Sequence, residues 1–115
     1  MLIVDDETQV RETVCEALSL EGYEVTAASD GAQALELIPT VRPDVIVFDL
    51  WMPVMDGWAF RRAQQASHPE IPVVVLSALN MRDPRLQELS AEAIVAKPFN
   101  LDDLYAAVAR AIGAG

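Results

Sequence analysis

Two short runs of apolar residues constrain the fold of this chain more than any other feature. Residues 45–48 are VIVF and residues 73–76 are VVVL, and neither run alternates with polar residues. Runs of this length that are rich in β-branched residues are typical of strands buried on both faces, as in a parallel sheet covered by helices. They are far shorter than the roughly 18 apolar residues of a membrane span. We therefore predict a parallel-sheet protein without a membrane segment.

Three weaker strands and five helices complete the pattern. The weaker strands are expected over residues 2–4, 23–27 and 93–96. Two helices show apolar residues at helical spacing, which are Val10, Val14, Ala17 and Leu18 in the first and Leu101, Leu104, Val108 and Ile112 in the last. Asn100 is the expected N-cap of the last helix.

The other three helices are expected over residues 30–38, 56–65 and 83–89, the third being uncertain because Pro84 fits only a first turn. Strands alternating with helices predict an α/β fold, a doubly wound five-stranded parallel sheet with five helices. Ligands of such sheets bind at the carboxyl ends of the strands.

Length and charge limit the function classes. The 115 residues fit one domain over residues 1–115, and a short first strand and a Gly-Ala-Gly end favour a domain excised from a longer protein. The formal charge of −10 opposes direct binding to nucleic acid. A single cysteine, Cys15, cannot form an internal disulfide, so we expect a cytoplasmic protein. Cys15 itself is interpreted as a small helix residue.

Polar residues follow four of the expected strands. Asp5 and Asp6 end the first, Asp49 the third, Ser77 the fourth and Lys97 the fifth. If the first, third and fourth strands are neighbours, the three carboxylates converge, and their repulsion requires a cation. Oxygen ligands without cysteine or histidine favour Mg²⁺ or Mn²⁺, and Mg²⁺ commonly binds one or two carboxylates together with a phosphate.

Lysine usage supports a phosphoryl site independently. Lys97 is the only lysine in the chain. Its ammonium could pair with Asp49 at rest and with a phosphoryl oxygen later, while the Ser77 hydroxyl donates to another oxygen. Each of these residues alone would be interpreted as a cap or a surface charge. Their placement after four strands makes that interpretation the weaker one.

Five segments resemble the receiver domains of two-component response regulators, a CheY-like superfamily. They are LIVDDE, DGAQAL, VFDLWMPVMDG, VVVLSA and AKPF, in this order, and they cover essentially the whole chain. The resemblance implies the flavodoxin-like receiver fold with strand order 2-1-3-4-5.

The resemblance also implies the chemistry. Asp6, Asp49 and the backbone carbonyl of Trp51 would bind the metal directly, and Asp5 would bind it through water. Asp49 would accept a phosphoryl group from a phosphohistidine of a histidine kinase or a histidine phosphotransfer protein, assisted by Lys97. The chain would thus assist its own phosphorylation without being a turnover enzyme. The Lys97–Pro98 bond would be cis.

Switching in this family implies further expectations. Movement of Ser77 would rearrange the fourth helix, the fifth strand and the fifth helix, and so control an output domain or protein, as a monomer or a phosphorylation-dependent dimer. Ile94 stands where the family commonly has an aromatic switch residue, and residues 77–97 are about two residues short by comparison with it. We therefore predict an atypical output surface with a brief or irregular fourth helix.

Two side chains bear on the lifetime of the phosphoryl group. Trp51 lies two residues after Asp49, and Leu79 lies two residues after Ser77. Neither can orient water, so we hypothesise slow self-dephosphorylation behind an apolar rim. The alternative is that both side chains merely pack on each other or on a partner.

Three other functions fit this sequence less well. A phosphatase of the haloacid dehalogenase class would place a general acid where Trp51 stands. An unphosphorylated docking module would not need the acids, Ser77 and Lys97, although Ile94 is compatible with it. A flavin site would need a phosphate-binding loop after the first strand, where Asp5 and Asp6 repel phosphate. His68, the only histidine, is interpreted as a loop residue.

Overall fold

Five parallel strands form the centre of the fold in the computed structural model, which describes residues 1–114. The strands are β1 (Leu2–Val4), β2 (Thr26–Ala28), β3 (Ile46–Asp49), β4 (Val73–Ser77) and β5 (Ala93–Ala96). Their order is β2-β1-β3-β4-β5, so the predicted doubly wound sheet and its strand order are confirmed. Gly115, the last residue of the suspected linker, lies outside the described residues, whereas Gly113 and Ala114 belong to the last helix.

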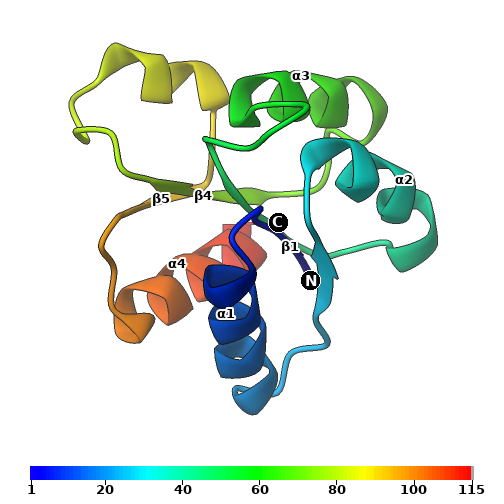
Figure 1. The fold of residues 1–115 in the computed structure, drawn as a ribbon, viewed down its shortest axis with the longest axis vertical. Coiled ribbons are helices and arrows are strands. Elements are labelled where there is room, and N and C mark those ends of the chain that lie inside the picture. Colours follow the sequence, from blue (N-terminus) through cyan, green and yellow to red (C-terminus); the bar gives the residue numbers. More distant parts are fainter. Residues whose placement is uncertain (115) are drawn as a thin grey trace.

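Helices cover both faces of this sheet (Figure 1). They are α1 (Thr8–Leu20), α2 (Gly31–Val41), α3 (Gly57–Ser67), the 3₁₀ helix η1 (Pro84–Leu89) and α4 (Leu101–Ala114). One apolar core lies under α2, α3 and η1, and a second core lies under α1 and α4. Within the described part of the chain, no helix is long and apolar enough to cross a membrane.

Side-chain caps set the beginnings of three helices. Asp30 accepts from the Gln33 N–H at 2.8 Å, and Asp56 accepts from the Ala59 N–H at 2.9 Å. These aspartates are therefore N-caps, and α2 and α3 begin one residue later than predicted. Asn100 accepts from the N–H three residues on at 2.8 Å, which confirms its predicted role.

Two other predicted boundaries differ most from the structure. β2 begins at Thr26 and not at residue 23, because Tyr23 and Val25 pack against the core under α1 and α4 without joining the sheet. Helix α2 continues through Pro39 to Val41, and Arg42 ends it in a left-handed conformation with φ 49°. The Arg42 N–H donates to the Ile38 carbonyl at 2.8 Å, so Pro39 does not end the helix.

The fourth helix is the 3₁₀ helix η1, and the prediction of a brief or irregular helix is confirmed. Pro84 occupies its first turn, and Asp83 accepts from the Arg85 N–H at 2.9 Å as the N-cap. Such helices have poorer hydrogen-bond geometry than α-helices and remain short. The position of η1 therefore depends on side chains of neighbouring elements.

Gly57 brings α3 directly against the segment that follows β3. Its N–H donates to the Leu50 carbonyl at 2.8 Å. A Cβ atom at this position would lie 2.7 Å from the Leu50 Cα and 3.2 Å from the Asp49 carbonyl oxygen. No side chain fits there, and the glycine therefore fixes how the end of β3 sits against α3.

Candidate functional site

Asp49 lies at the carboxyl end of the central strand β3 and is 5% exposed. Its Oδ2 accepts a hydrogen bond from Lys97 Nζ, and its Oδ1 accepts from the Trp51 backbone N–H at 3.1 Å. Both carboxylate oxygens are thus held by donors from different segments. The side chain is positioned by the sheet on one side and by the β3–α3 loop on the other.

Asp5 follows the neighbouring strand β1 and is only 1% exposed. Its Oδ1 accepts from the Glu7 N–H at 3.0 Å, whereas its Oδ2 has no hydrogen-bond partner within residues 1–114. Burial raises the pKa of Asp5, and the charges of Asp49 and Asp6 raise it further against the opposing effects of the Glu7 N–H and Lys97. This carboxylate therefore lies in an environment that disfavours its charge.

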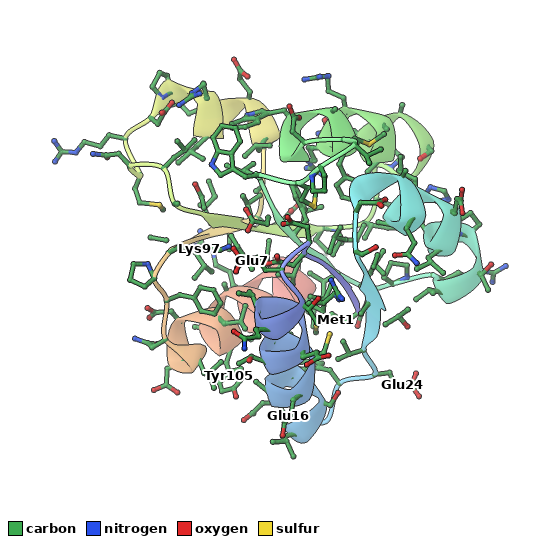
Figure 2. The ribbon with its side chains drawn as sticks, viewed as in Figure 1. Met1, Glu7, Glu16, Glu24, Lys97 and Tyr105 are labelled. Atoms are coloured by element: carbon green, nitrogen blue, oxygen red, sulfur yellow. The ribbon has the colours of Figure 1, made fainter. Side chains whose placement is uncertain are left out.

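Lys97 follows β5, and its backbone N–H donates to the Ser77 carbonyl at 2.7 Å. Its ammonium pairs with Asp49 and lies 4.0 Å from Asp5 Oδ2. Burial alone would lower the pKa of Lys97, but the hydrogen bond and charge of Asp49, with the charges of Asp5 and Glu7, raise it. Figure 2 shows Lys97 close to Glu7 at the start of α1. The Lys97–Pro98 bond is cis, as predicted.

Ser77 ends β4 and is fully buried. Its Oγ accepts from the Leu79 N–H at 3.0 Å. No hydrogen bond joins Ser77 Oγ to Asp49 or Lys97 among the described residues. The strand register nevertheless pairs Asp49 with Leu76, the residue before Ser77, so both polar residues lie at the same edge of the sheet.

The oxygen ligands at this edge of the sheet suit a hard divalent cation. They are the carboxylate oxygens of Asp5 and Asp49, and the unsatisfied Asp5 Oδ2 is a buried oxygen that a cation would satisfy. Within residues 1–114, no three histidine, cysteine or acidic side chains are arranged to hold a metal. Two buried carboxylates, Asp5 and Asp49, therefore meet where three were expected, and Asp6 is exposed. Two carboxylates are what Mg²⁺ commonly uses.

The three residues expected to modulate the site, Trp51, Leu79 and Ile94, contact other parts of the protein. Trp51 is 50% exposed and packs edge-to-face on Trp58, with ring centroids 5.5 Å apart. Leu79 and Ile94 are partly buried and pack against the core under α2, α3 and η1. Trp51 and Leu79 thus have contacts of their own, and the slow loss of the phosphoryl group stays a prediction.

His68 and Cys15, to which the sequence assigned no functional role, have ordinary surroundings. His68 is the C-cap of α3, and its Nδ1 lies 3.1 Å from Ser67 Oγ. Cys15 is partly buried in α1, and burial raises its pKa against the effect of the Arg11 charge. A raised thiol pKa disfavours the nucleophilic thiolate.

Arg11 contacts the site but was not identified from the sequence. Its Nη1 donates to the Asp5 carbonyl at 2.8 Å and so fixes the turn between β1 and α1. Arg11 comes six residues after Asp5, within α1, where its side chain can reach back over the preceding turn. In the sequence alone, such an arginine cannot be distinguished from an ordinary surface charge.

Known proteins share this sequence and fold. The response regulator receiver domain family matches residues 1–109. The response regulator MprA of Mycobacterium sp. (strain KMS) is 40% identical over 108 residues, covering 92% of this chain and 47% of that protein. The chain thus spans about half the length of the curated relatives it matches.

Solved structures agree with this match. The receiver domain of NtrX from Brucella abortus has a TM-score of 0.91 and 32% identity, covering 99% of this chain and 98% of that chain. The response regulator protein TrrA from Thermotoga maritima, in complex with Mg(2+)-BeF, has a TM-score of 0.85 and 30% identity, covering 95% of both chains.

Proposed function

Because this chain belongs to the response regulator receiver domain family of two-component signalling, we propose that Asp49 accepts a phosphoryl group from a partner's phosphohistidine. The partner is a histidine kinase or a histidine phosphotransfer protein. One observation carries this proposal: the buried Asp49 carboxylate pairs with the only lysine of the chain, beside the unsatisfied Asp5 Oδ2.

The transfer is a substitution at phosphorus. A carboxylate oxygen of Asp49 attacks the phosphorus, the P–N bond to the imidazole breaks, and the histidine keeps the electron pair and takes up a proton from solvent. The product is an acyl phosphate on Asp49. Lys97 pairs with the Asp49 carboxylate before the transfer and with a phosphoryl oxygen afterwards. The Ser77 hydroxyl donates to a second phosphoryl oxygen after leaving its contact with the Leu79 N–H.

Bound Mg²⁺ would neutralise charge on the phosphoryl oxygens. Asp5, Asp6, Asp49 and the Trp51 carbonyl are the residues we propose to hold it, with Asp5 acting through water. The Mg(2+)-BeF complex of TrrA supports this assignment, since its fold matches over 95% of this chain. Arg11 would keep the turn that carries Asp5 and Asp6 in place through its bond to the Asp5 carbonyl.

The output is a change of surface. We propose that phosphorylation rearranges the surface formed by η1, β5 and α4, which acts on an output domain or protein. The relatives are about twice as long as the matched segment, which is consistent with an attached output domain. The chain acts as a phosphoryl acceptor and not as a turnover enzyme.

Intact-mass measurement tests the acceptor directly. After incubation with acetyl phosphate and Mg²⁺, we expect wild type to gain one phosphoryl group. Asp49→Asn, or wild type with chelator, gains none, because the nucleophile or its counter-charge is missing. Asp102→Asn, at an exposed aspartate on α4, serves as the matched control and is labelled like wild type. Labelling of Asp49→Asn, or no labelling of wild type by any small phosphodonor together with no binding of beryllofluoride, contradicts the proposal.

A further inference from the structure

The only two tryptophans of the chain contact each other beside the phosphoacceptor. Trp51 lies in the β3–α3 loop, and Trp58 lies in the first turn of α3. Their rings meet at an interplanar angle of 65°, an edge-to-face arrangement. Trp51 is half exposed and Trp58 is partly buried, so the pair lies at the surface over the start of α3.

Each tryptophan is also tied to a different part of the molecule. The Trp51 backbone N–H donates to Asp49 Oδ1 at 3.1 Å. The Trp58 indole N–H donates to the Arg85 carbonyl of η1 at 2.9 Å, and the Arg85 guanidinium lies 5.8 Å from the Trp58 ring centroid. A continuous series of contacts therefore runs from the carboxylate of Asp49 to η1.

The other end of η1 is attached to α3 as well. Arg61 Nε donates to the Leu89 carbonyl at 2.7 Å, and its Nη2 donates to the Ser90 carbonyl at 2.9 Å. Side chains of one helix thus hold both ends of η1, whose own backbone hydrogen bonds are of the weaker 3₁₀ type. Trp58 contacts the amino end of η1, which follows the loop that begins at the end of β4.

We propose that Trp58 is a positioning residue that couples the state of Asp49 to η1. The inference rests on the proposed phosphorylation of Asp49. A group bound to Asp49 changes the charge on Oδ1, the acceptor of the Trp51 N–H. The Trp51 backbone moves with its acceptor, its ring moves against Trp58, and the indole N–H passes the shift to the Arg85 carbonyl. This route needs no aromatic side chain at position 94.

Amide hydrogen exchange with and without beryllofluoride and Mg²⁺ tests the coupling. In wild type, we expect bound beryllofluoride to change exchange at Leu86 and Ser90, whose N–H groups donate to Asp83 and Gln87 within and beside η1. Trp58→Phe keeps a ring against Trp51 but lacks the indole donor. In this variant, η1 exchanges about tenfold faster, as for the loss of one hydrogen bond, and no longer responds to beryllofluoride.

Arg85→Ala is the control variant, because it removes the guanidinium over the ring, together with its hydrogen bonds to Asp83, and leaves the accepting carbonyl. Loss of those bonds at the N-cap of η1 affects the basal exchange, so this variant is judged by its response to beryllofluoride. Its response to beryllofluoride persists. A second readout is made on wild type itself. We expect the indole N–H signal of Trp58 to shift in ¹H–¹⁵N spectra when beryllofluoride binds. Trp58→Phe assigns that signal, since the chain has only two indoles.

The outcomes separate the two proposals. Fluorine NMR shows whether beryllofluoride binds wild type. No binding, together with no labelling of wild type by any small phosphodonor, overturns the proposed function and the coupling together. Binding with unchanged η1 exchange and an unshifted Trp58 signal overturns the coupling alone, as does a Trp58→Phe variant that responds like wild type.

Discussion

At the scale of one residue, the buried carboxylate of Asp5 weakens the folded protein at neutral pH. The side chain is buried with one oxygen unsatisfied, and burial raises its pKa. The folded protein therefore keeps a proton on Asp5 at a pH where the unfolded chain has released it. Stability falls as pH rises from the ordinary aspartate pKa through the raised folded pKa, and the full cost is present above that window.

Asp5→Asn removes this cost. The amide oxygen can still accept from the Glu7 N–H, and no charge is buried. Without divalent ions at neutral pH, we expect the free energy of unfolding to rise by about 1 kcal/mol in urea titrations. The gain disappears at acidic pH, where wild type is protonated. Asp6→Asn, at the exposed neighbour, is the control, and an equal gain in that variant would contradict the explanation.

At the scale of elements, the attachment of η1 to α3 depends on a buried arginine. Arg61 is 5% exposed and donates to Gln64 Oε1 as well as to the carbonyls of Leu89 and Ser90. Burial lowers the pKa of Arg61, which the charge of Glu92 opposes. The guanidinium has no carboxylate within ion-pair distance among the described residues, so its carbonyl partners are what stabilise it.

Arg61→Met should therefore leave several buried acceptors without donors. We expect the free energy of unfolding to fall by about 1–3 kcal/mol, measured with urea. Arg62→Met changes the adjacent, exposed arginine and should stay within about 0.5 kcal/mol of wild type. Equal losses in both variants would show that the carbonyl contacts of Arg61 do not hold η1.

The elements also show how far a sequence predicts this structure. Continuous apolar runs predicted β3 and β4 because burial on both faces leaves a pattern within the strand itself. The sequence pattern places the start of β2 too early. Tyr23 and Val25 are apolar because they pack against the core, but they do not pair with β1. The contact of Trp58 with Arg85 and that of Arg61 with Leu89 join residues 27 and 28 positions apart. No local pattern encodes such contacts.

The positions of the strand ends predict part of the site. Polar residues after apolar runs predicted that Asp49 and Lys97 meet, and the structure pairs them. The roles in metal and phosphoryl binding that we assign to Asp5, Asp6, Ser77 and the Trp51 carbonyl stay predictions. The exposure of Asp6 depends on the direction of one turn, which the spacing of residues does not determine.

At the scale of the whole molecule, the charge of −10 affects every measurement with salt. Any salt screens the repulsion among the acidic groups and stabilises the folded state. Mg²⁺ bound at Asp5 and Asp49 should add to this, by about 2.7 kcal/mol when its concentration is 100 times the Kd. The comparison is therefore between MgCl₂ and NaCl at equal ionic strength.

We expect a higher melting temperature in MgCl₂ for wild type and no such difference for Asp49→Asn. Calorimetry provides the measurement. Equal melting temperatures of wild type in the two salts would mean that the acidic edge of the sheet is only a region of high charge and binds no cation.

The strand order has a consequence for biosynthesis. Asp5 and Lys97 come from near opposite ends of the chain, yet the Lys97 ammonium lies 4.0 Å from Asp5 Oδ2 and pairs with Asp49. At ordinary rates of translation, Lys97 joins the nascent chain roughly 5–20 s after Asp5. During that interval the ribosome carries a chain with an acidic edge and no ammonium to complete it. Under the proposed function, products of interrupted translation that end before Lys97 would therefore be inert as phosphoryl acceptors.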